Sequence, residues 1–179
     1  IVRGLGAFLL DENGKKYLDT VNNVAHVGHE NYVVVKAGQK QMALLNTNTR
    51  YLHENINELA KELLETLPKE LEVMHFVNSG SEANELALRL ARAYTQKQAL
   101  IVLDEAYHGH TNTLIDISPY KFDGRGGKGC PATTHVCEMP NLYRGRFRYD
   151  NENAAERYAH SVTRVLERMD EGVLPAAFI

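Results

Sequence analysis

The chain has 179 residues, 44% of them hydrophobic, which suits one domain with a sizeable buried core and excludes a disordered chain. Its net charge of -3, with acidic and basic residues interleaved, gives no basic stripe that could neutralise phosphates, so nucleic acid is not expected as a partner. No apolar run is long enough to cross a membrane and no secretory signal is recognisable, so we expect a cytoplasmic protein without a membrane partner.

The first part of the chain is predicted to hold a β-hairpin and a helix. Two short apolar runs between Ala7 and Asp19 flank Asp11-Glu12-Asn13-Gly14, and Asn-Gly in the middle of a turn predicts a hairpin. Residues 32–45 are apolar-rich and predicted to be helical, although three consecutive valines weaken that helix. We take residues 1–55 as an N-terminal segment built from these two elements.

Residues 56–179 alternate between strand and helix patterns, which predicts an α/β fold with a largely parallel sheet. A capping-box pattern at Asn55 and Glu58 opens an amphipathic helix that ends near Pro68. The elements predicted after it are a strand at 73–77, a turn at 78–81, a helix over 83–94, a buried strand at 99–103, a strand at 133–137, a helix over 155–169 ended by Gly172, and a terminal strand at 176–179.

Both ends of the chain look cut. It lacks an initiator Met, and it stops at an apolar run, residues 176–179, with no turn or cap after it. We therefore expect more sequence downstream.

No metal site is predicted. Cys130 and Cys137 lie on either side of His135 at a spacing that fits no standard zinc site, so both are expected to be unpaired thiols. The segment from His26 to Glu30 contains two histidines and a glutamate, yet it lacks the His-Glu-x-x-His order of a zinc protease.

The stretch most informative about chemistry is Asn78-Ser79-Gly80-Ser81, between a predicted strand and a helix. Backbone N–H groups at a helix N-terminus favour an anion, and Gly80 would let a phosphate approach the main chain closely. Ser81 would add a hydroxyl donor. A second interpretation stays open, in which a serine only caps the helix after a tight turn. The stretch is not a Walker loop, because no Gly-Lys-Ser/Thr follows.

A second informative stretch, Asp104 to His110, directly follows the strand predicted at 99–103. Ligands of open α/β sheets collect beyond the carboxyl ends of the strands, so this loop would lie beside the Gly80 turn if the two strands are neighbours. Tyr107 would then be placed to stack on a planar cofactor, and His108 to orient it or to transfer protons. A purely structural role for the Tyr-His pair is the alternative.

These stretches also carry a resemblance to a known family. The chain resembles the class III aminotransferases of pyridoxal-phosphate (PLP) fold type I, and the motifs that match are Phe76 to Glu85 (FVNSGSEANE), Ala91-Arg92, Tyr107-His108-Gly109, Tyr17 to Asp19 and Gly28-His29. The resemblance implies the N-terminal half of a PLP-binding large domain, with the cofactor held by Ser79, Gly80, Ser81, Tyr107 and His108.

In that family the turn matching Gly80 and Ser81 holds the cofactor phosphate, and the aromatic residue matching Tyr107 stacks on the pyridine ring. The resemblance further implies a homodimer. It also implies that the Schiff-base lysine lies beyond Ile179, so that the 179 residues alone would be inactive. After Gly28-His29 the family commonly continues with His-Pro, whereas this chain has Glu30-Asn31, where Asn31 can cap a helix instead.

Finer features resemble the phospho-lyase branch, whose members act on ethanolamine phosphate or 5-phosphohydroxylysine. They include His110, where ordinary class III transaminases usually carry Arg, and the segments at 45–53, 86–92, 117–122 and 143–145. By resemblance Asn22, Asn23 and Tyr51 approach the substrate, while Arg50, Lys121 and Arg144 are cations that could meet its phosphate. A surface or structural role is the alternative for each of these six residues. An aminotransferase of the same family and a non-catalytic PLP-binding or scaffold module remain as alternatives.

Overall fold

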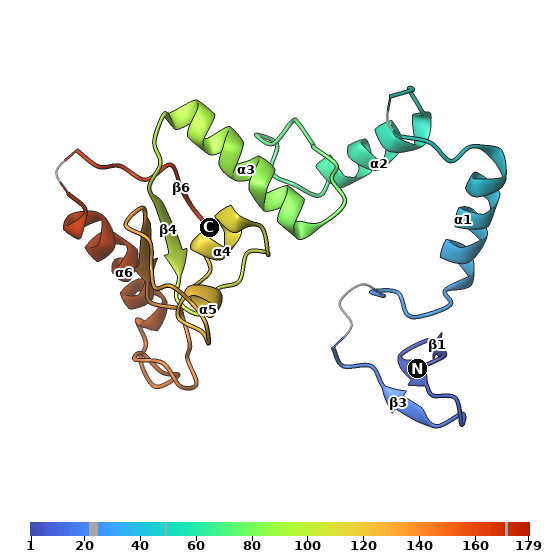
Figure 1. Cartoon of the computed structure of the whole chain (residues 1–179), viewed down its shortest axis with the longest axis horizontal. Helices are drawn as coiled ribbons and strands as arrows, with labels where there is room; N and C mark the ends of the chain where they lie inside the picture. The colour runs from blue at the N-terminus through green and yellow to red at the C-terminus, as the bar shows by residue number, and fades with distance from the viewer. Residues whose placement is uncertain (22–24, 49, 171) are drawn as a thin grey trace. The chain divides into compact units, whose positions relative to one another are not determined.

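The computed structural model describes residues 1–21, 25–48, 50–170 and 172–179, and the chain divides into two compact units, Ile1–Glu72 and Val73–Ile179 (Figure 1). The predicted boundary between residues 55 and 56 concerns the domains of the intact protein, and it stays a prediction.

The first unit begins with a small antiparallel sheet of three strands in the order β1-β2-β3, formed by Arg3–Leu5, Phe8–Leu10 and Lys16–Leu18. The turn between β2 and β3 is held by the carboxylate of Asp11, which accepts hydrogen bonds from two backbone N–H groups of the turn at 3.0 and 2.9 Å. Gly14 supplies the left-handed conformation of this turn, with φ of 78°. The predicted hairpin is confirmed, and β1 adds a strand that was not predicted.

Two helices follow the sheet. Helix α1, Tyr32–Leu44, is capped by Asn31, whose side chain accepts from two N–H groups of the first turn, so the predicted capping role of Asn31 is confirmed. Helix α2, Glu54–Leu64, is capped by His53, whose Nδ1 accepts from the Asn55 N–H at 3.2 Å. The capping box predicted at Asn55 is therefore wrong, because the imidazole of His53, two residues earlier, provides the acceptor.

The second unit contains a parallel sheet in the order β5-β4-β6, formed by Thr134–Cys137, Leu100–Leu103 and Ala177–Phe178. These three strands match the predictions for this part of the chain. The strand predicted at 73–77 is wrong, since no strand is formed there. An apolar run becomes a strand only where a neighbour completes its hydrogen-bond ladder, and Val73 and Phe76 remain 77% and 42% exposed.

Four helices accompany this sheet: α3 (Gly80–Thr95), α4 (Asn112–Asp116), α5 (Pro119–Phe122) and α6 (Ala154–Arg168). Leu88 of α3 and Leu114 of α4 pack with Leu100 and Val102 of β4. Ile101, whose side chain points to the opposite face of β4, packs on the side of the sheet that α6 covers. Helices α3 and α4 therefore cover one face of the sheet and α6 the other (Figure 1).

A third buried cluster fixes the loop that follows β5. The Tyr158 hydroxyl, on α6, accepts a hydrogen bond from the Phe147 N–H at 3.0 Å and lies 3.1 Å from the carbonyl oxygens of Asn141 and Phe147. The rings of Tyr158 and Phe147 meet edge to face with centroids 5.2 Å apart. A Cβ at Gly145 would lie 2.3 Å from the Tyr158 hydroxyl oxygen, so only glycine fits there.

Both cysteines are unpaired, as predicted, with Cys130 exposed and Cys137 buried. None of the helices in the described part of the chain is long and apolar enough to cross a bilayer.

Candidate cofactor-phosphate site

Helix α3 begins with a well-defined cap. The Ser79 hydroxyl accepts from the Glu82 N–H at 3.2 Å, and the Ser79 carbonyl accepts from the Ala83 N–H at 3.0 Å. Glu82 folds back, and its Oε2 accepts from the backbone and side-chain nitrogens of Asn78 at 2.6 and 3.1 Å. This variant of the capping box confirms the capping interpretation for Ser79 and leaves Gly80 and Ser81 for another role.

The start of α3 has the properties that a phosphate needs. A Cβ added at Gly80 would meet no atom within 4 Å, so the space in front of this residue is open. Ser79 accepts from the N–H groups of Glu82 and Ala83, whereas those of Gly80 and Ser81 find no acceptor among the residues that the structure describes. Two free donors at the positive end of a 16-residue helix fit the cofactor's phosphate group.

The loop after β4 lies against this helix start. The Asn84 side chain donates to the carbonyl of His108 at 2.7 Å, and Thr111 donates to Glu85 at 2.5 Å. Between these contacts, the Ser81 hydroxyl oxygen is 3.3 Å from His110 Nδ1. From the sequence we expected this loop to lie beside the Gly80 turn because the strands that precede the two segments would be neighbours in one sheet. The placement is confirmed, but it comes from helix-to-loop hydrogen bonds instead.

Gly109 allows this close approach. Its backbone φ is 141°, a conformation that residues other than glycine rarely adopt. A Cβ there would lie 2.6 Å from both the Ser81 hydroxyl oxygen and a methyl carbon of Leu114. The glycine therefore lets the loop main chain pass directly over Ser81.

Tyr107 presents its ring at the carboxyl end of β4. The side chain is 53% exposed. Tyr120 meets its ring edge to face with centroids 6.0 Å apart, and Lys121 Nζ lies 5.5 Å from the ring centroid. The ring is thus supported by two neighbours while much of it stays available to a stacking partner.

His108 points into the protein. Its backbone N–H donates to the Ser118 hydroxyl at 3.0 Å, and its buried Nε2 has no partner among the described groups. Burial lowers the pKa of His108 below the ordinary histidine value, so its ring is held in the neutral form near neutral pH. This favours the structural alternative for His108, while Tyr107 keeps its candidate role.

Comparison with known proteins bears on what this arrangement does. The sequence profile of the family "Aminotransferase class-III" matches residues 1–179. A Drosophila melanogaster protein named "Alanine--glyoxylate aminotransferase 2-like" is 46% identical over 100% of this chain and 37% of the relative. The Caenorhabditis elegans "Ethanolamine-phosphate phospho-lyase homolog 1" is 41% identical over 91% of the chain and 37% of the relative.

This chain belongs to the class III aminotransferase family. Among solved structures, a phospholyase from Arthrobacter in complex with phosphoethanolamine superposes with a TM-score of 0.79 and 37% identity, covering 93% of this chain and 38% of that one. The chain thus spans little more than a third of the length of these relatives. Membership confirms the α/β fold class, the expectation of an enzyme and PLP as the cofactor of the class III family.

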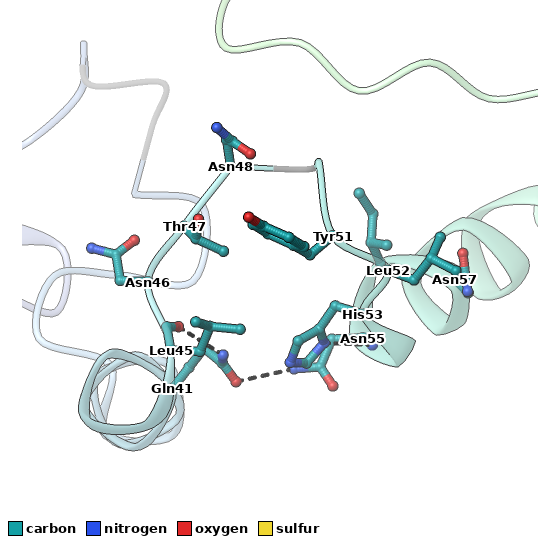
Figure 2. Close-up of a pocket in the computed structure, with 11 residues that line it drawn as sticks. Gln41, Leu45, Asn46, Thr47, Asn48, Tyr51, Leu52, His53, Asn55 and Asn57 are labelled. Atoms are coloured by element: carbon teal, nitrogen blue, oxygen red, sulfur yellow. Dashed lines mark hydrogen bonds between the residues drawn. The ribbon is translucent and has the colours of Figure 1, made fainter.

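Of the three residues expected near the substrate, only Tyr51 lies in the described part of the chain. Asn22 and Asn23 lie outside the described residues. Tyr51 lines a pocket of about 310 Å³ between the end of α1 and the start of α2, where Figure 2 shows its ring extending toward Thr47. Their role toward a substrate stays a prediction. No cluster of three potential metal ligands occurs in the ranges that the structure describes.

Sequence reasoning missed two residues that lie near Ser81 in the structure. His110 was noted only as a mark of the phospho-lyase branch, and Gly109 only as part of a motif. His110 contacts Ser81, and Gly109 leaves no room for a Cβ beside it, although both lie far from Ser81 along the chain. The available signal was the glycine itself, which directly precedes a polar residue in a loop at the carboxyl end of a strand.

Proposed function

We propose that this chain is the cofactor-phosphate part of a PLP-dependent phospho-lyase that releases phosphate and ammonia from ethanolamine phosphate or 5-phosphohydroxylysine. The observation that carries the site is the open start of α3, with two free N–H groups at Gly80 and Ser81 under the Tyr107 loop. The preference for a lyase is supported by 41% and 37% identity to a phospho-lyase homologue and a phospholyase.

In this proposal each residue has a limited task. Gly80 and Ser81 hold the phosphate through their N–H groups, and the Ser81 hydroxyl adds a third donor. Tyr107 stacks on the cofactor ring and fixes its plane. When bound, PLP withdraws electrons from the amine substrate so that a proton can be lost and a neighbouring leaving group expelled. Lys121, which reaches the Tyr107 ring, brings a cation near whatever stacks there.

Several parts of the proposal concern the intact protein. The lysine that carries the cofactor is predicted to lie beyond Ile179, and the active assembly is predicted to be a homodimer. The cytoplasmic location is likewise a prediction.

The reaction is tested with the full-length enzyme and ethanolamine phosphate or 5-phosphohydroxylysine, without any oxo acid. A neighbouring phosphate is a good leaving group, so we expect phosphate and ammonia in equal amounts. The alternative is an aminotransferase, which is supported by the 46% identity to the Drosophila relative. Strict dependence on a 2-oxo acid, with no phosphate released, would establish that alternative, whereas PLP binding without turnover would indicate a scaffold.

The site is tested separately by Gly80→Val. Because a Cβ at this position meets nothing within 4 Å, the folded protein should accept the substitution. A bound phosphate should not, so PLP affinity should fall by about tenfold or more. The dissociation constant of PLP and the melting temperature of the PLP-free protein are measured together. Unchanged PLP affinity would remove the start of α3 from the site.

A further inference from the structure

Two nitrogens of His110 meet the hydroxyl of Ser81. His110 Nδ1 lies 3.3 Å from the Ser81 oxygen, and the backbone N–H of His110 donates to the same oxygen at 3.4 Å. Ser81 is the second residue of α3, whereas His110 comes from the loop after β4. One hydroxyl at the start of the helix is therefore contacted by a side chain from another element.

The contact is held in place from both sides. On one side, Asn84 of α3 binds the carbonyl of His108, and on the other, Glu85 of α3 binds Thr111. Between them, Gly109 passes so close to Ser81 that no side chain fits at its position. His110 is exposed, yet its main chain is fixed on the residue that it contacts.

A serine hydroxyl has one proton to donate and two lone pairs that accept. If His110 Nδ1 carries no proton, the Ser81 hydroxyl donates to it and has none left for another acceptor. If Nδ1 carries the proton, it donates to Ser81, and both lone pairs of the hydroxyl are filled by His110. The hydroxyl proton then points to a third partner. A phosphate at the start of α3 is an acceptor that selects this second arrangement.

We propose that His110 is a positioning residue for the cofactor phosphate. It donates from Nδ1 to the Ser81 hydroxyl and thereby turns the hydroxyl proton toward the phosphate. This inference rests on the proposed function, in which the start of α3 holds the phosphate of PLP.

The opposing hypothesis is that His110 only fastens the loop to α3. The two hypotheses differ in what they predict for a ligand without a phosphate. A positioning role affects PLP and leaves pyridoxal, which lacks the phosphate, unaffected. A fastening role affects both ligands, because it would shift the loop that carries Tyr107.

The experiment uses the full-length enzyme and the variants His110→Leu, His110→Asn, Ser81→Ala and the double variant Ser81→Ala/His110→Leu. Dissociation constants are measured for PLP and for pyridoxal by absorbance titration of the cofactor-free protein. His160→Leu, on the exposed side of α6, is the matched control. Melting temperatures of the cofactor-free variants report whether each one folds.

We expect His110→Leu to weaken PLP binding roughly threefold to tenfold and to leave pyridoxal binding unchanged, since one hydrogen bond to the phosphate is lost. His110→Asn should restore most of the affinity, because its amide nitrogen can donate from about the position of Nδ1. The double variant should bind PLP no more weakly than Ser81→Ala, because His110 acts through Ser81.

Three results would overturn the inference. Equal losses for PLP and pyridoxal in His110→Leu would identify a fastening role. A loss in Ser81→Ala without any loss in His110→Leu would reject His110 and leave the proposed function intact. No loss in either variant would reject the phosphate site itself, and with it both proposals.

Discussion

In Ile1–Glu72 no described residue is buried, whereas Val73–Ile179 contains three buried hydrophobic clusters. The elements of the first unit are nevertheless well formed, with side-chain caps at Asn31 and His53 and a carboxylate-bound turn at Asp11. Local hydrogen bonds thus mark where these helices and turns begin and end, but helices of 11 and 13 residues are marginal in water without a covering partner.

Helix α2 shows the difference most clearly. Its apolar residues recur at helical spacing, as those of α3 and α6 do, yet Leu59 and Leu63 are 47% and 39% exposed. In contrast, Leu88 of α3 is 2% exposed because β4 covers it. An apolar stripe therefore predicts that a helix has a face to bury, and the covering partner has to come from elsewhere.

The largest expected effect tests this comparison directly. Leu114→Ala, in the core of the second unit, should lower the free energy of unfolding by about 2–5 kcal/mol, because it leaves a cavity among fully buried neighbours. Leu59→Ala in α2 is the matched change and should cost about 1 kcal/mol or less. Urea unfolding of the full-length protein measures both. A loss at Leu59 as large as that at Leu114 would show that α2 is covered in the intact protein.

The next effect compares two glycines with positive φ. Gly109→Ala should destabilise the protein by about 1–3 kcal/mol from backbone strain, and more from the contacts with Ser81 and Leu114. Gly14→Ala also places alanine at positive φ, but in open space, so its cost should be about 1 kcal/mol. Thermal melts supply the measurement. Equal losses of stability in the two variants would mean that the loop moves to accommodate the alanine side chain, so that Gly109 does not lie tightly against Ser81.

The helix caps should show effects of similar size in both units. Ser79→Ala and Asn31→Ala each remove a side chain that accepts from first-turn N–H groups, and each should cost about 1 kcal/mol. Amide hydrogen exchange in α3 and α1 reports the two losses separately. If only Ser79→Ala raised the rate of amide hydrogen exchange, the Asn31 cap would not contribute to the stability of α1.

The smallest effect is a pH dependence at His108. Because burial lowers its pKa in the folded state, the unfolded state binds the proton more readily. The free energy of unfolding should therefore fall as pH drops through the ordinary histidine pKa of about 6.5 toward the lowered value, with no contribution above that window. His108→Gln should flatten this part of the profile, and His160→Gln should not. A profile unchanged by His108→Gln would show that the ring is hydrated.

Much of the fold could be predicted because its signals are local. The apolar run at 99–103, the Asn13-Gly14 turn and the periodic faces of α3 and α6 each identified an element. Strand β1 was missed because Arg3-Gly4-Leu5 carries no strand pattern, and α4 and α5 because four or five residues are too short to show a period. The strand at 73–77 failed because pairing depends on a partner that the run itself does not specify.

The candidate site, like the fold, has parts that the local sequence predicts and parts that it does not. Gly80 and Ser81 could be proposed from the sequence because a small, polar turn before a helix is a local signal for anion binding. Tyr107 could be proposed because it follows a predicted strand. Their roles toward the cofactor stay predictions. The contact of His110 with Ser81, and the lack of room for a Cβ at Gly109 beside it, could not be predicted, because they join segments that only the tertiary structure brings together.

Gly145 meets two obstacles to substitution, and a change at Tyr158 removes only one of them. A Cβ at position 145 would lie 2.3 Å from the Tyr158 hydroxyl oxygen and 2.4 Å from the carbonyl oxygen of Asn141. A smaller residue at position 158 would clear the first collision, whereas the second is with the main chain of the same loop. Among descendants of this sequence Tyr158 can therefore change while Gly145 stays, but Gly145 should not change unless the loop main chain is rebuilt as well.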